Sequence, residues 1–355
     1  MKRHPSGRRS GVAVPAFLCL LFAAMLLLGS RAGGDALAER VLSALAQNER
    51  FVSGAFVLGT GQYPGDASLH TPRAAVAGME TEPTDEDLAE LDTAMENAGL
   101  EPEPETESET DPAEVPPVKL NNQSGLSVDL DALLQNPKQL SLTGDGPQVL
   151  VYHTHATEAY TPSGTDTYEA SGDARTLDTE QNVVRVGAEL CRVLESHGIK
   201  TVHLTDLNDY PSYNGSYGQS LRLVQAALEK YPTVQMAIDV HRDAILADDG
   251  SKYALTCTQD GQQVAQLMLV MGTNANGLAF DDWADHLGYA VTLQSALNAD
   301  HPGLMRSINL RKQRFNLHLT PASMLLEVGS SGNTLQQALS SVRLFGDTLA
   351  ALWGK

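Results

Sequence analysis

The chain has 355 residues, enough for one large or two modest domains, and carries a formal net charge of −20. The charge is uneven, because residues 80–114 contain fifteen acidic residues and no lysine or arginine. No basic face is evident that would neutralise phosphates, so nucleic acid is excluded as an expected partner. The cysteines lack metal-type spacing. We expect Cys191 and Cys257 to be free thiols, with a disulfide between them as the alternative.

The N-terminus combines basic residues with an apolar run. Lysine and arginine side chains in residues 1–11 precede an apolar segment at 12–29. This segment is at the short end for a membrane-spanning helix and long for a signal-peptide core. Basic residues on that side keep the tip cytoplasmic. We therefore predict a single-pass protein of the cytoplasmic membrane, with everything after the anchor outside. Cleavage near Ala38 is the alternative.

Two segments separate the predicted anchor from a folded domain. Residues 30–80 form a membrane-proximal region, in which 35–51 has helical spacing and would be a connector or contact a partner. Residues 81–117 are rich in Glu, Thr, Pro and Asp and hold few apolar residues. Such a composition cannot offset the entropy cost of ordering, so we predict a disordered acidic linker.

Residues 118–355 show the alternation of an α/β domain. Predicted strands occupy residues 149–152, 199–204, 234–240, 265–271 and 324–328, and predicted helices residues 180–197, 220–231, 280–298 and 334–353. This alternation predicts a mostly parallel sheet with helices on both faces. The carboxyl ends of the strands are then the expected place for a site.

Two predicted strands lead into residues of the types that bind metals. His155 follows the first strand, Glu158 comes three residues later, and His241 ends the strand at 234–240. Two histidines and a carboxylate are the protein ligands of a catalytic zinc, which keeps a fourth position for water. We predict these three residues as zinc ligands, with Glu180 as the alternative carboxylate. If the first strand persists, His153 points the same way as His155.

Other polar side chains near these strand ends are candidates for catalysis. Glu327 lies among apolar residues of the last strand, which would raise its pKa, and it is predicted to transfer a proton during amide hydrolysis. An ion pair with Arg242 is the alternative. Arg242 is predicted to hold a substrate carboxylate or to pair with Asp239 or Asp243. His153 is predicted to support a ligand or to donate a proton.

A loop at 209–217 contains three tyrosines beside turn residues. Tyr213 and Tyr217 are predicted to stack on sugar rings and to bind amides of a substrate. The alternative is a loop that these rings fix to its own domain.

His155, His203 and His318 each begin an H-x-T triplet. This short pattern is typical of two-histidine phosphoesterases, which we keep as a distant alternative. It would leave Glu158 and Glu327 without a role.

Several motifs together resemble the stage II sporulation protein P family. They lie at residues 152–158, 182–187, 209–217, 239–243, 326–329 and 333–334. The resemblance implies the fold and ligand set of zinc N-acetylmuramoyl-L-alanine amidases. It supports His155, Glu158 and His241 as ligands and Glu327 as the catalytic carboxylate, and it suggests that Asn333 contacts the substrate.

The same resemblance implies a biological role. Members of the family hydrolyse peptidoglycan at the amide between the stem peptide and muramic acid, and also at peptide cross-links. They are anchored in the mother-cell membrane and act with the stage II sporulation proteins D and M in septal thinning and engulfment. We therefore expect a zinc amidase domain at 118–355, located outside the membrane. A non-enzymatic scaffold that binds the cell wall is the alternative.

Overall fold

The computed structural model describes residues 115–170, 174–247 and 249–355. All of them belong to the second of two units of the chain, Met79–Lys355. The predicted tip, anchor, membrane-proximal region and acidic linker lie outside the described residues, apart from the last three linker positions. Within the described part of the chain, no helix is both long and apolar enough to cross a membrane.

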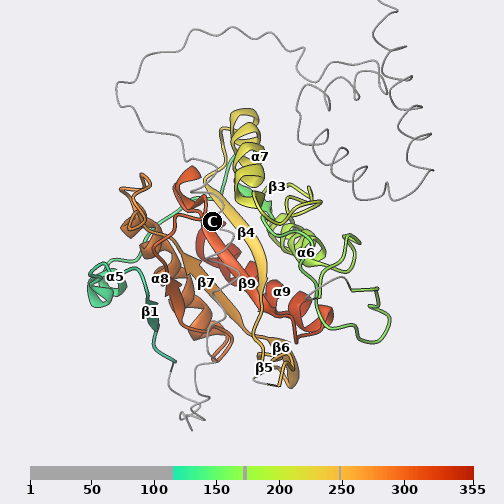
Figure 1. The fold of residues 1–355 in the computed structure, drawn as a ribbon. Coiled ribbons are helices and arrows are strands. Elements are labelled where there is room, and N and C mark those ends of the chain that lie inside the picture. Colours follow the sequence, from blue (N-terminus) through green and yellow to red (C-terminus); the bar gives the residue numbers. More distant parts are fainter. Residues whose placement is uncertain (1–114, 171–173, 248) are drawn as a thin grey trace, which may run out of the picture. The chain divides into compact units, whose positions relative to one another are not determined.

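A seven-stranded sheet in the order β1-β8-β7-β9-β4-β2-β3 forms the centre of the fold (Figure 1). The strands are β1 (Leu120–Asn122), β2 (Val149–Tyr152), β3 (Thr201–His203), β4 (Met236–Asp243), β7 (Leu267–Met271), β8 (Ile308–Leu310) and β9 (Met324–Ser330). Every neighbouring pair is parallel except β7 and β9, which are antiparallel. The predicted mostly parallel sheet is confirmed, with one reversal that the sequence did not predict.

Helices cover both faces of this sheet, as predicted. They are α5 (Leu130–Gln135), α6 (Val183–Ser196), α7 (Ser216–Lys230), α8 (Trp283–Asp300) and α9 (Leu335–Trp353). The side chains of β2 alternate between the faces. Val149 and Val151 join the main core, where α6 packs on the sheet beside α9, and α9 also contacts α8. Leu150 and Tyr152 join a second apolar cluster with Val224 of α7. Thus α7 covers the opposite face.

Capping residues account for where the helices begin. Asn182 caps α6 by accepting a hydrogen bond from the Val184 N–H at 3.0 Å, and Thr334 forms a capping box with Gln337 at α9. Helix α7 begins at Ser216, earlier than predicted, after Gly215 with a left-handed φ of 90°. The last two residues of the predicted tyrosine loop are therefore helical.

A small hairpin was not predicted from the sequence. Strands β5 (Thr256–Gln259) and β6 (Gln262–Ala265) pair antiparallel. Asp260 and Gly261 connect them with φ values of 50° and 76°. Positive φ at both positions is the requirement of a type I′ turn, for which Asp-Gly is a preferred sequence. The Asp260-Gly261 dipeptide was thus a signal in the sequence from which this hairpin could have been predicted.

Both described cysteines are free thiols, as predicted, and no disulfide joins them. Cys191 lies in α6, where burial raises the pKa of its thiol to about 12. Such a thiol is protonated at neutral pH and behaves as an apolar core group.

Candidate metal centre

Strands β4 and β9 lie side by side and present their polar residues in register. His241 of β4 pairs with Glu327 of β9. Asp239, two residues before His241, pairs with Tyr152 of β2. Because side chains alternate along a strand, Asp239, His241 and Glu327 project to the face that carries Tyr152. This is the face covered by α7.

A turn brings His155 to the same place. Strand β2 ends at Tyr152, and the turn that follows is closed by a hydrogen bond from the Glu158 N–H to the His155 carbonyl at 3.2 Å. The rings of His155 and His241 meet edge to face, with centroids 5.1 Å apart. The strand does not persist to residue 155, so the condition for His153 and His155 to share a direction is not met.

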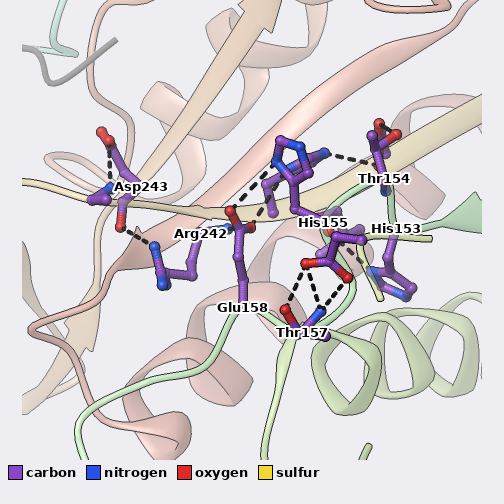
Figure 2. Close-up of polar contacts among 12 residues, drawn as sticks. His153, Thr154, His155, Thr157, Glu158, Arg242 and Asp243 are labelled. Carbon is purple, nitrogen blue, oxygen red and sulfur yellow. Dashed lines mark hydrogen bonds and ion pairs between the residues drawn. The ribbon is translucent and has the colours of Figure 1, made fainter. Parts of the chain in front are cut away.

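His155, Glu158 and His241 form a buried cluster whose candidate ligand atoms all lie within 4.8 Å of one another. One carboxylate oxygen of Glu158 is 3.6 Å from Nδ1 of His155, and the other is 3.3 Å from Nδ1 of His241 (Figure 2). A tetrahedral zinc with bonds of about 2.0–2.2 Å separates its ligand atoms by roughly 3.3–3.6 Å. His241 Nδ1 makes no hydrogen bond within the described residues. The donor types fit zinc, and each histidine nitrogen lies at about this spacing from one oxygen of Glu158.

Electrostatics keep the carboxylate of this cluster ionised. Burial alone would raise the pKa of Glu158, but its close contacts with the imidazoles of His155 and His241 and the charges of His241 and Arg242 outweigh burial and hold the pKa well below its usual value. The main-chain N–H of Arg242 also donates to Glu158 at 3.1 Å. A carboxylate must be deprotonated to bind a metal, so this environment favours the binding form.

Glu327 has the opposite environment. Its side chain is buried, and its Oε2 atom accepts no hydrogen bond from any described residue. Burial raises the pKa of Glu327 well above its usual value, and the charges of Asp243 and Glu158 add to the increase while His241 opposes it. The pKa of Glu158 is thus lowered and that of Glu327 raised. Such a difference between neighbouring carboxylates is typical of sites in which the two have different chemical roles.

Both predicted tyrosines lie at the cluster. Tyr213 stacks on His155 with ring centroids 4.5 Å apart, and the guanidinium of Arg175 lies over the Tyr213 ring. The buried ring of Tyr217 meets His155 edge-on at 5.6 Å. The hydroxyl of Tyr217 has no hydrogen-bond partner within the described part of the chain. The rings thus hold the loop against the site, and their contact with substrate stays a prediction.

His153 is not at the cluster, which corrects its predicted role in proton donation. Its Nδ1 is 2.9 Å from the Val240 carbonyl, and its Nε2 is 2.9 Å from Nε2 of His203. Burial, with His203 adding to it, lowers the pKa of His153 to about 3. The ring packs against Gly187 of α6 on the other face of the sheet. A neutral histidine there supports strand β4 at Val240, the residue before His241.

The close approach of Gly187 to His153 gives a first prediction. A Cβ on Gly187 would lie 2.5 Å from Cε1 of His153 and 2.9 Å from Nε2 of His203. His153 cannot easily move, because both of its ring nitrogens are engaged. We expect Gly187→Ala to lower the free energy of unfolding by about 2–3 kcal/mol, measured by urea denaturation of the full-length chain.

Gly288→Ala is the matched control in α8. There a Cβ would meet the end of the flexible Lys138 side chain, 2.8 Å from its Cε. Alanine's higher helix propensity should make this variant neutral or more stable by up to about 1 kcal/mol. If Gly187→Ala were as stable as Gly288→Ala, this would contradict the close contact between His153 and Gly187 of α6.

The side chain of Arg242 is held by main-chain carbonyls. This side chain is buried, with Nε donating to the Ala159 carbonyl at 2.9 Å and Nη2 to the Ala174 carbonyl at 3.2 Å. Asp243 pairs instead with Arg306 at 2.8 Å. The pairing of β4 with β9 shifts register between His241 and Asp243, at the position of Arg242. A substrate carboxylate would have to displace these main-chain bonds, and the substrate contact of Arg242 stays a prediction.

Asn333 and Glu180 are likewise separate from the cluster. The fully buried Asn333 accepts a hydrogen bond from the Ser330 N–H at 2.8 Å and donates to the Leu255 carbonyl at 2.9 Å. It therefore fixes the connection between β9 and α9 rather than offering a surface to substrate. Glu180 is exposed and lies 3.7 Å from Arg185. Glu158 is the carboxylate that the fold brings to the histidines.

The ring contacts of the described residues do not join any two of the three H-x-T histidines. His155 contacts His241, His203 contacts His153, and His318 contacts Phe280. A two-histidine phosphoesterase site requires two such motifs to meet, so the geometry does not favour that reading.

Two buried carboxylates at this site were not singled out from the sequence. Asp239 was considered only as a partner of Arg242, and Asp209 only as part of the tyrosine loop. They bond to Thr154 and Thr157, which directly precede His155 and Glu158. The position of Asp239 two residues before His241 on one strand was an available signal. No such signal existed for Asp209, which lies in a loop.

The fold and the cluster define an α/β protein with a buried histidine–glutamate–histidine group at strand ends, suited to a metal. The sequence profile described as Stage II sporulation protein P matches residues 63–350, and the chain belongs to that family. The family predicted from the motifs is confirmed.

A curated relative agrees with this assignment. Stage II sporulation protein P of Bacillus subtilis (strain 168) is 29% identical over 231 residues, covering 61% of this chain and 53% of the relative. The match thus spans about half the length of that relative.

Two solved structures are similar over 59% of the chain. The apo form of the N-acetylmuramyl-L-alanine amidase Ami1 from Mycobacterium abscessus has 10% identity and a TM-score of 0.34, with 99% of that chain covered. The N-acetylmuramoyl-L-alanine amidase AmiC2 of Nostoc punctiforme has 15% identity and a TM-score of 0.30, with 96% covered.

Proposed function

We propose that this protein is a zinc-dependent peptidoglycan hydrolase, an N-acetylmuramoyl-L-alanine amidase that acts on the septal wall during sporulation. The observation that carries the proposal is the buried cluster of His155, Glu158 and His241, with Glu327 in register beside it. Membership of the stage II sporulation protein P family supports a role in sporulation. The substrate is the amide between the stem peptide and muramic acid.

The residues at the site have different proposed roles. His155, Glu158 and His241 would hold the ion. When bound there, the ion would supply a Lewis acid for the scissile carbonyl and for a water molecule. Glu327, whose pKa is raised by burial, accepts the proton of the attacking water and delivers it to the leaving nitrogen. Tyr213 presents its ring beside His155 and binds a sugar ring or an amide of the substrate.

Further parts of the proposal rest on the family and on the sequence outside the described residues. They are cleavage of peptide cross-links, a membrane anchor at residues 12–29 with the domain outside, and joint action with the stage II sporulation proteins D and M in engulfment. The N-terminal anchor would hold the domain close to the septal wall.

The test uses the purified full-length chain and peptidoglycan sacculi. We expect about one zinc per chain, release of soluble material, loss of release after chelation and recovery when zinc is restored. Mass spectrometry of the products should show intact stem peptides with a free alanine amino group. Zinc binding with no cleavage, even with proteins D and M added, would indicate the scaffold instead. A chain without zinc would contradict the metal assignment.

A further inference from the structure

The turn that carries two of the cluster residues is held twice in the same way. Thr154 donates both its main-chain N–H, at 2.8 Å, and its hydroxyl, at 2.6 Å, to the carboxylate of Asp239. Thr157 donates its N–H, at 3.1 Å, and its hydroxyl, at 2.5 Å, to the carboxylate of Asp209 (Figure 2). Each threonine directly precedes a residue of the cluster.

Both carboxylates are buried, although burying a charge is costly. Asp239 is 0% exposed, and the side chain of Asp209 is also 0% exposed. Such groups persist only where hydrogen bonds and opposite charges satisfy them. Two donors from a single threonine fix both its peptide plane and its side-chain rotamer. The backbone direction that leads into His155 or Glu158 is then fixed as well.

Asp239 also reaches the second histidine. Its Oδ1 lies 3.0 Å from Nε2 of His241, at ion-pair distance but outside hydrogen-bond geometry. Nδ1 of the same ring faces Glu158. A carboxylate on the far nitrogen of a ligand histidine sets its tautomer and ring orientation. Asp239 therefore links His241 to the turn of His155 through Thr154.

Asp209 reaches the rest of the cluster through Arg175. Nη1 of Arg175 is 2.8 Å from Asp209, and Nη2 is 3.5 Å from Oε1 of Glu158. The same guanidinium lies over Tyr213, which stacks on His155. Asp209 is therefore connected to Glu158 both through Thr157 and through Arg175.

We propose that Asp239 and Asp209 are positioning residues that hold the zinc site in its binding geometry before the metal arrives. Asp239 orients His155 and His241, and Asp209 orients Glu158. This inference rests on the proposed zinc binding and adds two residues to it that touch neither the metal nor the substrate. Partners of this kind typically change metal affinity by 10–100-fold when they are removed.

The test measures zinc dissociation constants of the full-length chain by competition with a chromophoric chelator. Asp239→Asn and Asp209→Asn should each weaken zinc binding by about 10–100-fold. Thr154→Val and Thr157→Val keep the side-chain shape and remove the hydroxyl, and should weaken binding by about tenfold. Thr154→Ser and Thr157→Ser restore the donor and should bind within about twofold of the parent.

Thr348→Val is the matched control. The hydroxyl of the buried Thr348 in α9 donates to Asp300 at 3.1 Å, away from the cluster. Losing this bond should change stability and leave zinc affinity unchanged. Visible spectra of the cobalt-substituted proteins provide a second readout, because ligand orientation changes the position and intensity of the cobalt bands. We expect a changed spectrum for Asp239→Asn and an unchanged one for Thr348→Val.

The possible results separate the two proposals. A parent that binds zinc, with Asn and Val variants that are folded and match its affinity and cobalt spectrum, would overturn the positioning role alone. If the Asn variants do not fold, the Val and Ser pairs decide in the same way. A parent that binds no zinc would overturn both the positioning role and the proposed function.

Discussion

Replacing Glu327 by glutamine is expected to slow release of soluble material from sacculi by a factor of about 10²–10⁴ while zinc content stays at the parent level. Glutamine has the shape of glutamate but cannot accept the proton of the attacking water. Glu327 lies outside the trio of candidate ligand atoms, so metal binding should not depend on it. The measurement pairs the initial rate with metal analysis of the same sample.

Glu189→Gln is the control for this variant. Glu189 is a buried glutamate of α6 whose carboxylate pairs with Arg192 and Arg343 and is not among the candidate metal ligands. The Glu189→Gln variant should be somewhat less stable than the parent and keep full activity. Normal cleavage by Glu327→Gln would remove Glu327 from the mechanism. Loss of zinc together with activity would show that Glu327 serves the metal instead of the proton.

The strand ends were predictable because local patterns determine them. An apolar run leads to His241, two residues before β4 ends at Asp243, and a similar run surrounds Glu327 in β9. That these two residues face each other was not predictable. Their pairing depends on which strands are neighbours, and the order β7-β9-β4-β2 does not follow the sequence. The antiparallel reversal at β7 depends on the same long-range choice.

Strand alternation bears on two of the residues assigned from the sequence. His153 was assigned beside His155 on the assumption that β2 continues, whereas it ends at Tyr152. For Arg242 the alternation was available and was not used. The period of two predicts that a residue next to His241 points away from it, and Arg242 bonds to main-chain carbonyls instead. A period-two reading would have grouped Asp239, His241 and Glu327 instead.

Loops set the limit of what a single sequence predicts at this site. Asp209 lies 52 residues from Thr157, and only tertiary packing brings them together. Tertiary packing also brings Arg175 and Tyr213 together from two separate loops, with the guanidinium of Arg175 over the Tyr213 ring. Composition predicted tyrosines suited to a substrate, but it did not predict that one of them stacks on a candidate metal ligand.

Replacing either cluster histidine by alanine is expected to remove the stabilisation that zinc gives to the folded chain. A ligand present at 100 times its dissociation constant stabilises the folded state by about 2.7 kcal/mol. For the parent, urea denaturation with and without zinc should show a gain of about this size. His155→Ala and His241→Ala each remove one of the three candidate ligands, and neither should show a gain at the same zinc concentration.

The two variants should differ when zinc is absent. His241 lies against two buried carboxylates, 3.3 Å from Glu158 and 3.0 Å from Asp239, and their charges raise the pKa of its imidazole although burial opposes this. Removing one partner of a buried ion pair costs about 3–5 kcal/mol. His155 contacts Glu158 at the longer distance of 3.6 Å. We therefore expect His241→Ala to lower the stability of the zinc-free chain more than His155→Ala does.

The exposed His197 provides the control, since it pairs with Asp347 at the surface. His197→Ala should keep the whole zinc-dependent gain. If His155→Ala and His241→Ala kept it as well, zinc would bind elsewhere and the cluster would be an ordinary buried ion pair. If the gain were lost only in His241→Ala, His155 would not be a ligand, and the turn held by Thr154 and Thr157 would serve the packing of the domain rather than the metal.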